Sequence, residues 1–296
     1  MEGSNKLKIS YVKKMFEVGL TSKEIDFIMY LALSQDYTGL VRGVYYKTVS
    51  EAIDVSYPEF YQIIRDLSEK QMIIAEKKHR IDWEVQLVDN KFDYPEAYAE
   101  GYVKISAMFT QESFRRLKAG SKMLALEFMR LSAASRASVR ISKTRLYEKY
   151  CAMLHVQRRM IRTYIAEIRH FFAVYVKEGI VYITPYRASK ERAAGGSETD
   201  KCQMSFVKAI CRRNHIDCNK DDHAVKSVKS LINQYKGRCI ECGERIERVM
   251  EYSVAASIEM INRNVKKKKA WVRELRPKLI HKIIKNVLKI DTEMNF

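Results

Sequence analysis

Glycine and proline are scarce in this sequence, with 11 glycines and 4 prolines among 296 residues. An all-β sandwich needs a turn about every 8–12 residues, and such turns are rich in both residues. The same scarcity excludes a Gly-rich nucleotide-binding fold. The composition therefore predicts a mainly helical chain, and its 47% hydrophobic content is enough to build real cores.

Long apolar runs and a regular cysteine framework are absent as well. The longest apolar runs, Ile28–Leu33 and Phe171–Val176, are far shorter than a membrane span. The N-terminal segment lacks the apolar region of a secretion signal. Six cysteines without framework spacing are typical of reduced thiols. We therefore expect a cytoplasmic protein that does not contact a membrane.

The sequence also lacks the short motifs of common enzyme classes. It contains no P-loop, no dinucleotide-binding glycine motif, no HExxH zinc motif and no GxSxG nucleophile elbow. Its six histidines are scattered, and each is interpreted as a surface or packing residue. We therefore expect no catalytic site and no cofactor.

Positive charge is in excess, and the excess is unevenly distributed. Lys and Arg total 54 against 36 Asp and Glu, which gives a formal charge of +18. Residues 1–92 hold 13 basic and 14 acidic side chains, residues 112–170 hold 14 and 4, and residues 171–296 hold 26 and 15. Because each neutralised phosphate adds affinity, we expect a polyanion to bind the middle and the last third. The alternative is a basic surface that serves only solubility.

The first third shows a pattern of three helices followed by two strands. Thr21 or Ser22 can cap the first helix, and Ser56 caps the third, which has Pro58 in its first turn. The expected elements are a helix from Thr21, a helix over 48–53, a helix from Ser56, and strands over 72–75 and 83–88 on either side of the charged stretch 76–80.

The same pattern recurs about 101 residues later, and one register fits six pairs of apolar residues. The later copy predicts helices over 122–133, 143–153 and 156–172, and strands over 173–176 and 180–184. The matched apolar pairs are Ile25 with Leu126, Phe27 with Phe128, Val55 with Val156, Phe60 with Ile161, Ile64 with Ile165, and Leu67 with Ile168.

The segments SYPEFYQIIRDLSEKQMI and HVQRRMIRTYIAEIRHFF carry a resemblance to the winged helix-turn-helix superfamily. The paired arrangement resembles the tandem winged-helix proteins of bacterial plasmids and phages, which include replication initiators and related regulators. The resemblance covers residues 21–185 and leaves the last third unmatched. It implies that the third helix of a module enters the major groove of DNA. It also implies that one of the two modules can serve dimerisation instead, for which the near-neutral residues 1–92 are the candidate.

The third helix of the later copy is the most cationic candidate for DNA contact. Arg158, Arg162 and Arg169 lie four and seven residues apart, so one helical face presents guanidinium groups that suit phosphate or guanine. The alternative is a solvated charged face on a core helix. The residues expected to contact DNA are Tyr57, Tyr61, Gln62, Arg65, Lys77, Lys78, Arg80, Arg115, Arg116, Gln157, Arg158, Arg159, Arg162, Thr163, Arg169, Lys177, Lys266, Lys267, Lys268 and Lys269.

The last third predicts helices at about 201–213, 222–235, 240–263 and 270–289. Two apolar stripes, from Ile246 to Ile261 and from Leu275 to Leu288, either pack on each other as a helical domain or form a dimer interface. The lysine run that begins at Lys266 is either a solvated turn or a non-specific phosphate clamp. Cys239 and Cys242 have CxxC spacing, but a zinc site normally needs a second close pair, so we expect no metal.

The sequence thus predicts a mainly α protein with two tandem winged helix-turn-helix modules, small β-hairpin wings and a C-terminal all-helical region. The expected divisions are an N-terminal module at 1–92, a linker with a short strand and helix at 93–118, a basic module at 119–186, a flexible loop at 187–200 and a helical domain at 201–296.

The expected function is sequence-specific binding of double-stranded DNA, as a dimeric transcriptional regulator associated with the nucleoid and working with the transcription or replication machinery. Two alternatives stay open. One is a plasmid or phage replication initiator that binds repeated sites at an origin. The other is a structural protein whose winged helices bind protein surfaces.

Overall fold

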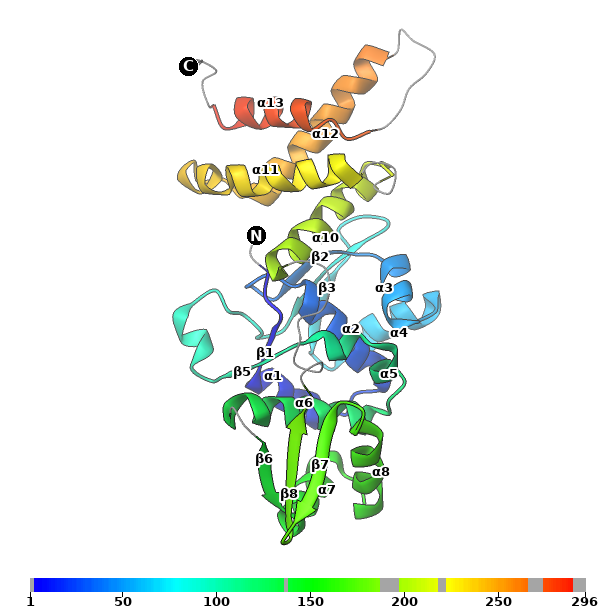
Figure 1. Ribbon diagram of the computed structural model, residues 1–296. Helices are drawn as coiled ribbons and strands as arrows, with labels where there is room; N and C mark the ends of the chain where they lie inside the picture. The colour runs from blue at the N-terminus through cyan, green and yellow to red at the C-terminus, as the bar shows by residue number, and fades with distance from the viewer. Residues whose placement is uncertain (1–2, 136–137, 187–196, 218–221, 266–273, 290–296) are drawn as a thin grey trace.

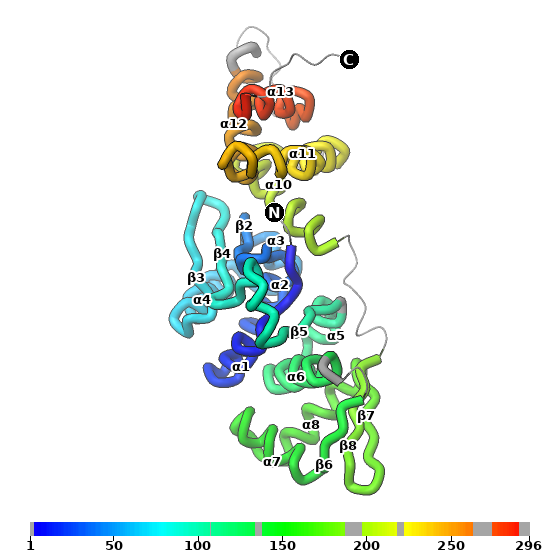
Figure 2. The backbone as a smooth tube through the Cα atoms, turned by 90° about the vertical axis from the view of Figure 1, so that its left-hand side faces the viewer, coloured from blue at the N-terminus to red at the C-terminus, as the bar shows by residue number. Residues whose placement is uncertain are grey.

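The structure is a computed structural model that describes residues 3–135, 138–186, 197–217, 222–265 and 274–289. It is mainly helical with small antiparallel sheets, as the scarcity of glycine and proline predicts. Figures 1 and 2 show an elongated molecule that has the C-terminal helices at one end and residues 119–185 at the other. None of the helices in the described part of the chain combines the length and apolar composition that a bilayer span requires.

The first unit, residues 22–87, contains three helices and a three-stranded sheet. Its elements are α2 (Ser22–Ser34), β2 (Leu40–Val44), α3 (Tyr46–Ile53), α4 (Tyr57–Glu69), β3 (Ile73–Glu76) and β4 (Trp83–Leu87). The strand order is β2-β4-β3, with antiparallel pairing throughout. The sequence predicted each of these elements except β2.

Two helices of the first unit begin where their capping residues predict. The Thr21 hydroxyl accepts the Glu24 N–H, while the Glu24 carboxylate accepts the Thr21 N–H at 2.6 Å. Ser56 and Glu59 form the same reciprocal pair at the start of α4. These capping boxes satisfy backbone donors that have no partner within a helix, and so they fix both starting points.

The second unit, residues 119–185, repeats the element order and the strand order of the first. Its elements are α6 (Ala119–Ser135), β6 (Val139–Ser142), α7 (Lys143–Leu154), α8 (Arg158–Ile168), β7 (Phe172–Lys177) and β8 (Ile180–Pro185), with strand order β6-β8-β7. Phe27 and its match Phe128 are both fully buried. Asp54 ends α3 and His155 ends α7 in the same left-handed conformation. The 101-residue register therefore holds in the structure as far as β3 and β7, whereas the last strand is offset because the turn between β7 and β8 is shorter.

The segments before and between the two units also contain secondary structure. The longest element there is α1 (Ile9–Glu17), and the rest are short. The others are β1 (Lys6–Lys8), η1 (Pro95–Tyr98), β5 (Tyr102–Lys104), η2 (Ala107–Thr110) and α5 (Glu112–Arg115). Strand β1 pairs with β5, and Phe109 and Phe114 are buried in the core that both units share. Residues 93–118, which the sequence predicts as a linker, are therefore packed against both units.

A buried ion pair joins α2 to α6 inside this shared core. The Lys122 ammonium lies 2.6 Å from a carboxylate oxygen of Asp26, and both side chains are almost completely buried. The same ammonium donates to the Ser22 hydroxyl at 2.7 Å. Burial raises the pKa of Asp26 and lowers the pKa of Lys122, because a charge of either sign loses its hydration there.

The C-terminal helices form a second core of their own. They are α10 (Glu198–Arg213), α11 (Asp222–Glu241), α12 (Ile246–Val265) and α13 (Pro277–Val287). Val254 and Ile258 of α12 share this core with Ile280 and Ile284 of α13. The two apolar stripes thus pack on each other, which is the first of the two alternatives that the sequence left open. Helix α10 connects this core to the first unit by packing on β2.

Candidate nucleic-acid interface

Helix α8 is amphipathic, and its polar face is cationic. Ile161, Tyr164 and Ile168 are buried, which directs the opposite side of the helix to solvent. That side is defined here as the α8 face. It consists of the exposed residues Gln157, Arg158, Arg159, Arg162 and Arg169.

An aromatic ring on α7 holds two of these arginines together. The guanidinium carbons of Arg158 and Arg162 lie 5.9 Å and 5.8 Å from the centre of the Tyr147 ring. Attraction between a cation and an aromatic face limits the conformations of both side chains. Tyr147 is not among the residues predicted from the sequence, although its position in the helix before the arginines was a usable signal.

The hairpin of β7 and β8 stands at the same end of the molecule as α7 and α8 (Figure 1). Its turn contains Glu178 and Gly179, both with positive φ, and Lys177 is exposed beside them. The Lys143 N–H donates to the Gly179 carbonyl at 2.9 Å, which attaches the turn to the start of α7. The position of Lys177 relative to the α7–α8 pair is therefore fixed by the backbone.

Further cations that the sequence analysis did not single out lie on the second unit. Lys143 and Arg145 are exposed in the first turn of α7. Arg140 of β6 lies over the ring of Tyr182 at 5.7 Å. The spacing of these residues gave no signal in the sequence, because only the fold brings the start of α7 and the hairpin side by side.

Thr163 and Glu167 are the remaining polar residues of α8. The Thr163 hydroxyl donates to the Arg159 carbonyl at 3.3 Å, one turn earlier in the same helix. The Glu167 carboxylate pairs with Lys118 at 3.0 Å and accepts the Ser121 hydroxyl at 2.5 Å. The single carboxylate of α8 is thus compensated by residues outside the α8 face.

The corresponding face of the first unit is aromatic rather than cationic. Tyr57 is exposed, and its hydroxyl lies 3.1 Å from the hydroxyl of Tyr61, whose ring contacts Trp83. Gln62 donates to Asp66 on the same helix. Arg65, the single cation that the sequence analysis placed on this face, is exposed.

Two cations in the basic hairpin of the first unit make contacts within the protein. Lys78 pairs with Glu76 at 2.8 Å, and the Lys77 ammonium lies 5.9 Å from the Trp83 ring. Arg80 is exposed. At the base of the hairpin, buried Asp82 pairs with Arg213 of α10 at 3.1 Å. This hairpin is therefore attached to the C-terminal helices.

Arg115 and Arg116 have partners outside the α8 face. The half-buried Arg115 guanidinium donates to the carbonyl of Ala52 in α3, and Arg116 pairs with Glu112 within α5. The contact with Ala52 places Arg115 against the first unit, whereas the Arg116 side chain is exposed. The run from Lys266 to Lys269 lies outside the described residues.

The CxxC pair does not assemble a metal centre in the described part of the chain. Cys239 is buried and Cys242 is exposed, and burial raises the pKa of the Cys239 thiol. Among the described residues no three His, Cys, Asp or Glu side chains are grouped as a metal site would require. Cys218 lies outside those residues.

No family model, curated protein or solved structure matches the chain. The chemistry of the site is therefore inferred from its own residues. These are an exposed face of guanidinium groups, an aromatic ring that holds two of them, and a hairpin fixed beside the helix.

Proposed function

We propose that this chain binds double-stranded DNA sequence-specifically through its second unit and acts as a transcriptional regulator. Helix, strand, two helices and a β-hairpin follow one another in each unit, which is the element order of a winged helix-turn-helix. In this proposal α7 and α8 form the helix-turn-helix, α8 enters the major groove, and the β7–β8 hairpin is the wing.

The observation that carries the proposal is the exposed guanidinium cluster of the α8 face. The major groove of B-DNA is wide enough for an α-helix, and guanine presents two acceptors there to which arginine can donate a bidentate pair. Arg158 and Arg162, positioned on Tyr147, supply such donors, while Lys177 and Arg169 suit flanking phosphates.

The first unit has a different role in this proposal. Its α4 exposes Tyr57 among acidic residues such as Glu59 and Glu69, so a duplex gains little electrostatic attraction there. Exposed aromatic rings are enriched at protein interfaces. We therefore assign this surface to contact with a second copy of the chain or with a protein of the transcription or replication machinery.

A replication initiator would use the same DNA contact at repeated sites beside an origin. The positions of genomic sites separate the two roles, because sites that flank promoters favour a regulator. Tandem sites at an origin favour an initiator instead.

The experiment that tests the proposal is selection of bound duplexes from a random pool, followed by a salt titration of the selected duplex and a scrambled one. If the second unit neutralises about five phosphates, the slope of log Kobs against log salt is about −4.5. The selected duplex keeps its advantage over the scrambled one at every salt concentration. Failure to enrich any sequence, together with salt-independent binding, would contradict the proposal.

A further inference from the structure

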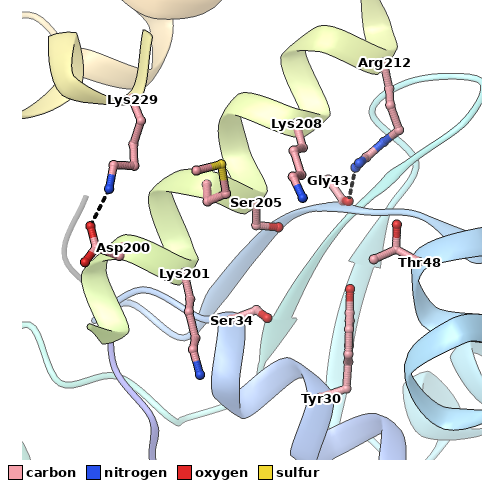
Figure 3. A pocket seen from close by; sticks show the side chains of 11 residues that line it. Tyr30, Ser34, Gly43, Thr48, Asp200, Lys201, Ser205, Lys208, Arg212 and Lys229 are labelled. Atoms are coloured by element: carbon pink, nitrogen blue, oxygen red, sulfur yellow. Dashed lines mark hydrogen bonds and ion pairs between the residues drawn. The ribbon is translucent and has the colours of Figure 1, made fainter. Parts of the chain in front are cut away.

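A pocket of about 460 Å³ lies between α10 and the first unit, on residues to which the DNA-binding proposal gives no role. Its walls come from α2, β2 and α3 on one side and from α10 and α11 on the other (Figure 3). Its volume is in the range of small-ligand sites. Figure 1 shows α10, which supplies one wall, beside the other C-terminal helices, whereas α8 is at the far end of the molecule.

One face of α10 lines this pocket with cations. Lys201, Ser205, Lys208 and Arg212 are four, three and four residues apart, which places them on one side of the helix. Figure 3 shows their side chains directed from α10 toward α2 and β2. Lysine and arginine side chains gathered on one wall of a concave site attract anions.

The carboxylate among the pocket residues already forms an ion pair. Asp200 pairs with Lys229 of α11 at 2.6 Å, so these two charges compensate each other. Arg212 is held by neutral groups, since it donates to the Gly43 carbonyl at 2.7 Å and lies 5.0 Å from the Tyr45 ring. The charge of Arg212 is thus fixed in position without being neutralised by these contacts.

The opposite wall supplies hydroxyl groups and an aromatic surface. Ser34 of α2 and Thr48 of α3 line the pocket together with Tyr30. Burial raises the pKa of Tyr30 to about 12, so its hydroxyl keeps the proton and can donate. The side chain of Met204 adds an apolar surface on the α10 side. Hydroxyls beside cations suit phosphate oxygens, whereas the ring and the thioether suit an uncharged organic group.

The close approach of β2 and α10 depends on Gly43. This residue has φ of +72°, and a Cβ built on it would lie 2.2 Å from the Cβ of Ala209. A larger residue would separate the strand from the helix. The spacing of the two pocket walls is therefore built into the backbone.

We propose that this pocket binds a small phosphate monoester of about mononucleotide size. Lys208 and Arg212, one helical turn apart, hold the phosphate, and Lys201 holds a further polar or anionic group at the other end. Tyr30 and Met204 contact the organic part. Because the ligand touches both the first unit and the C-terminal helices, its binding stabilises their contact.

The test is calorimetric titration of the full chain with adenosine 5′-monophosphate, glycerol 3-phosphate and pyrophosphate, with adenosine as the uncharged comparison. At least one phosphate compound is expected to bind, and adenosine to bind at least about tenfold more weakly than its monophosphate. Lys208→Met keeps the aliphatic stem, and we expect it to weaken binding about tenfold or more. Lys282→Met, on an exposed residue of α13 outside the pocket, is expected to change nothing.

Three results would overturn the proposal. The first is the absence of binding by all three phosphate compounds at millimolar concentration. The second is phosphate binding that both Lys208→Met and Lys201→Met leave unchanged. The third is loss of duplex binding in Lys208→Met as large as that in Arg158→Ala, which would assign Lys208 to a DNA surface. A far-ultraviolet circular dichroism spectrum of each variant shows that it is folded.

Discussion

Replacing Arg158 or Arg162 by alanine is expected to weaken binding of the selected duplex by about 1–3 kcal/mol, roughly 5- to 150-fold in Kd. The reason is the loss of two parallel hydrogen bonds to a guanine, which alanine cannot replace. Since both guanidinium groups contact Tyr147, the effects of the two substitutions are expected to be non-additive. Fluorescence anisotropy of a labelled duplex at fixed salt measures the change.

Three controls define what such a loss means. Arg162→Lys keeps the charge but removes the bidentate donor pair, so we expect it to retain binding to scrambled DNA while losing the preference for the selected site. Arg238→Ala, which removes an exposed cation from α11, is expected to have no effect on DNA binding. If Arg65→Ala on the first unit costs as much as Arg162→Ala, both units read DNA and the assignment of the second unit as the main reader is wrong.

Removing one partner of the buried Lys122–Asp26 pair is expected to lower the free energy of unfolding by about 3–5 kcal/mol. Asp26→Leu leaves the Lys122 ammonium in the core without its carboxylate. Lys122→Met leaves the Asp26 carboxylate, one oxygen of which already has no hydrogen-bond partner. Urea unfolding followed by circular dichroism measures both losses.

The double variant Asp26→Leu with Lys122→Met distinguishes loss of a charge partner from loss of packing. With neither charge present, no desolvation cost remains, and we expect stability to recover to near the wild-type value. The exposed pair Arg116–Glu112 is the matched control, and Glu112→Gln is expected to cost at most about 1 kcal/mol. A double variant as unstable as the sum of the single ones would show that the pair matters only through its volume.

Local signals in the sequence predicted most of the helices. Thr21 with Glu24 and Ser56 with Glu59 are capping boxes. Each provides hydrogen-bond acceptors for backbone N–H groups at the start of its helix, and both partners lie within four consecutive residues. The 101-residue register predicted equivalent core positions such as Phe27 and Phe128, because two copies of one fold bury the same positions. The exposure of the arginines on α8 follows from the apolar residues on its other side.

Elements that depend on distant pairing were not predictable in this way. Strand β2 pairs with β4, where Leu40 faces Gln86, and strand β1 pairs with β5, where Lys6 faces Lys104. Strands β1 and β2 carry too little alternation to be seen without their partners, whereas the similarly short β3 and β4 were predicted because they follow a helix and flank the charged stretch 76–80. The position of Arg115 was missed for a similar reason, because its acceptor, the Ala52 carbonyl, belongs to a helix far away in sequence.

The pocket between α10 and the first unit could be predicted from the sequence only in part. Lys201, Lys208 and Arg212 have the spacing of a single helical face, which the sequence shows. What that face meets depends on the contact between Gly43 and Ala209, which are far apart in the chain. Only the fold therefore places these cations opposite Tyr30 and the hydroxyl groups of α2 and α3.

The most direct measurement is photo-crosslinking to the selected duplex from a photoreactive residue at Gln157, the exposed residue before α8, compared with one at Gln62 on α4. Crosslinking from position 157 and not from position 62 is the result expected if the second unit inserts α8 into the groove. Crosslinking from position 62 alone, or from neither position while the duplex is bound, would contradict that assignment.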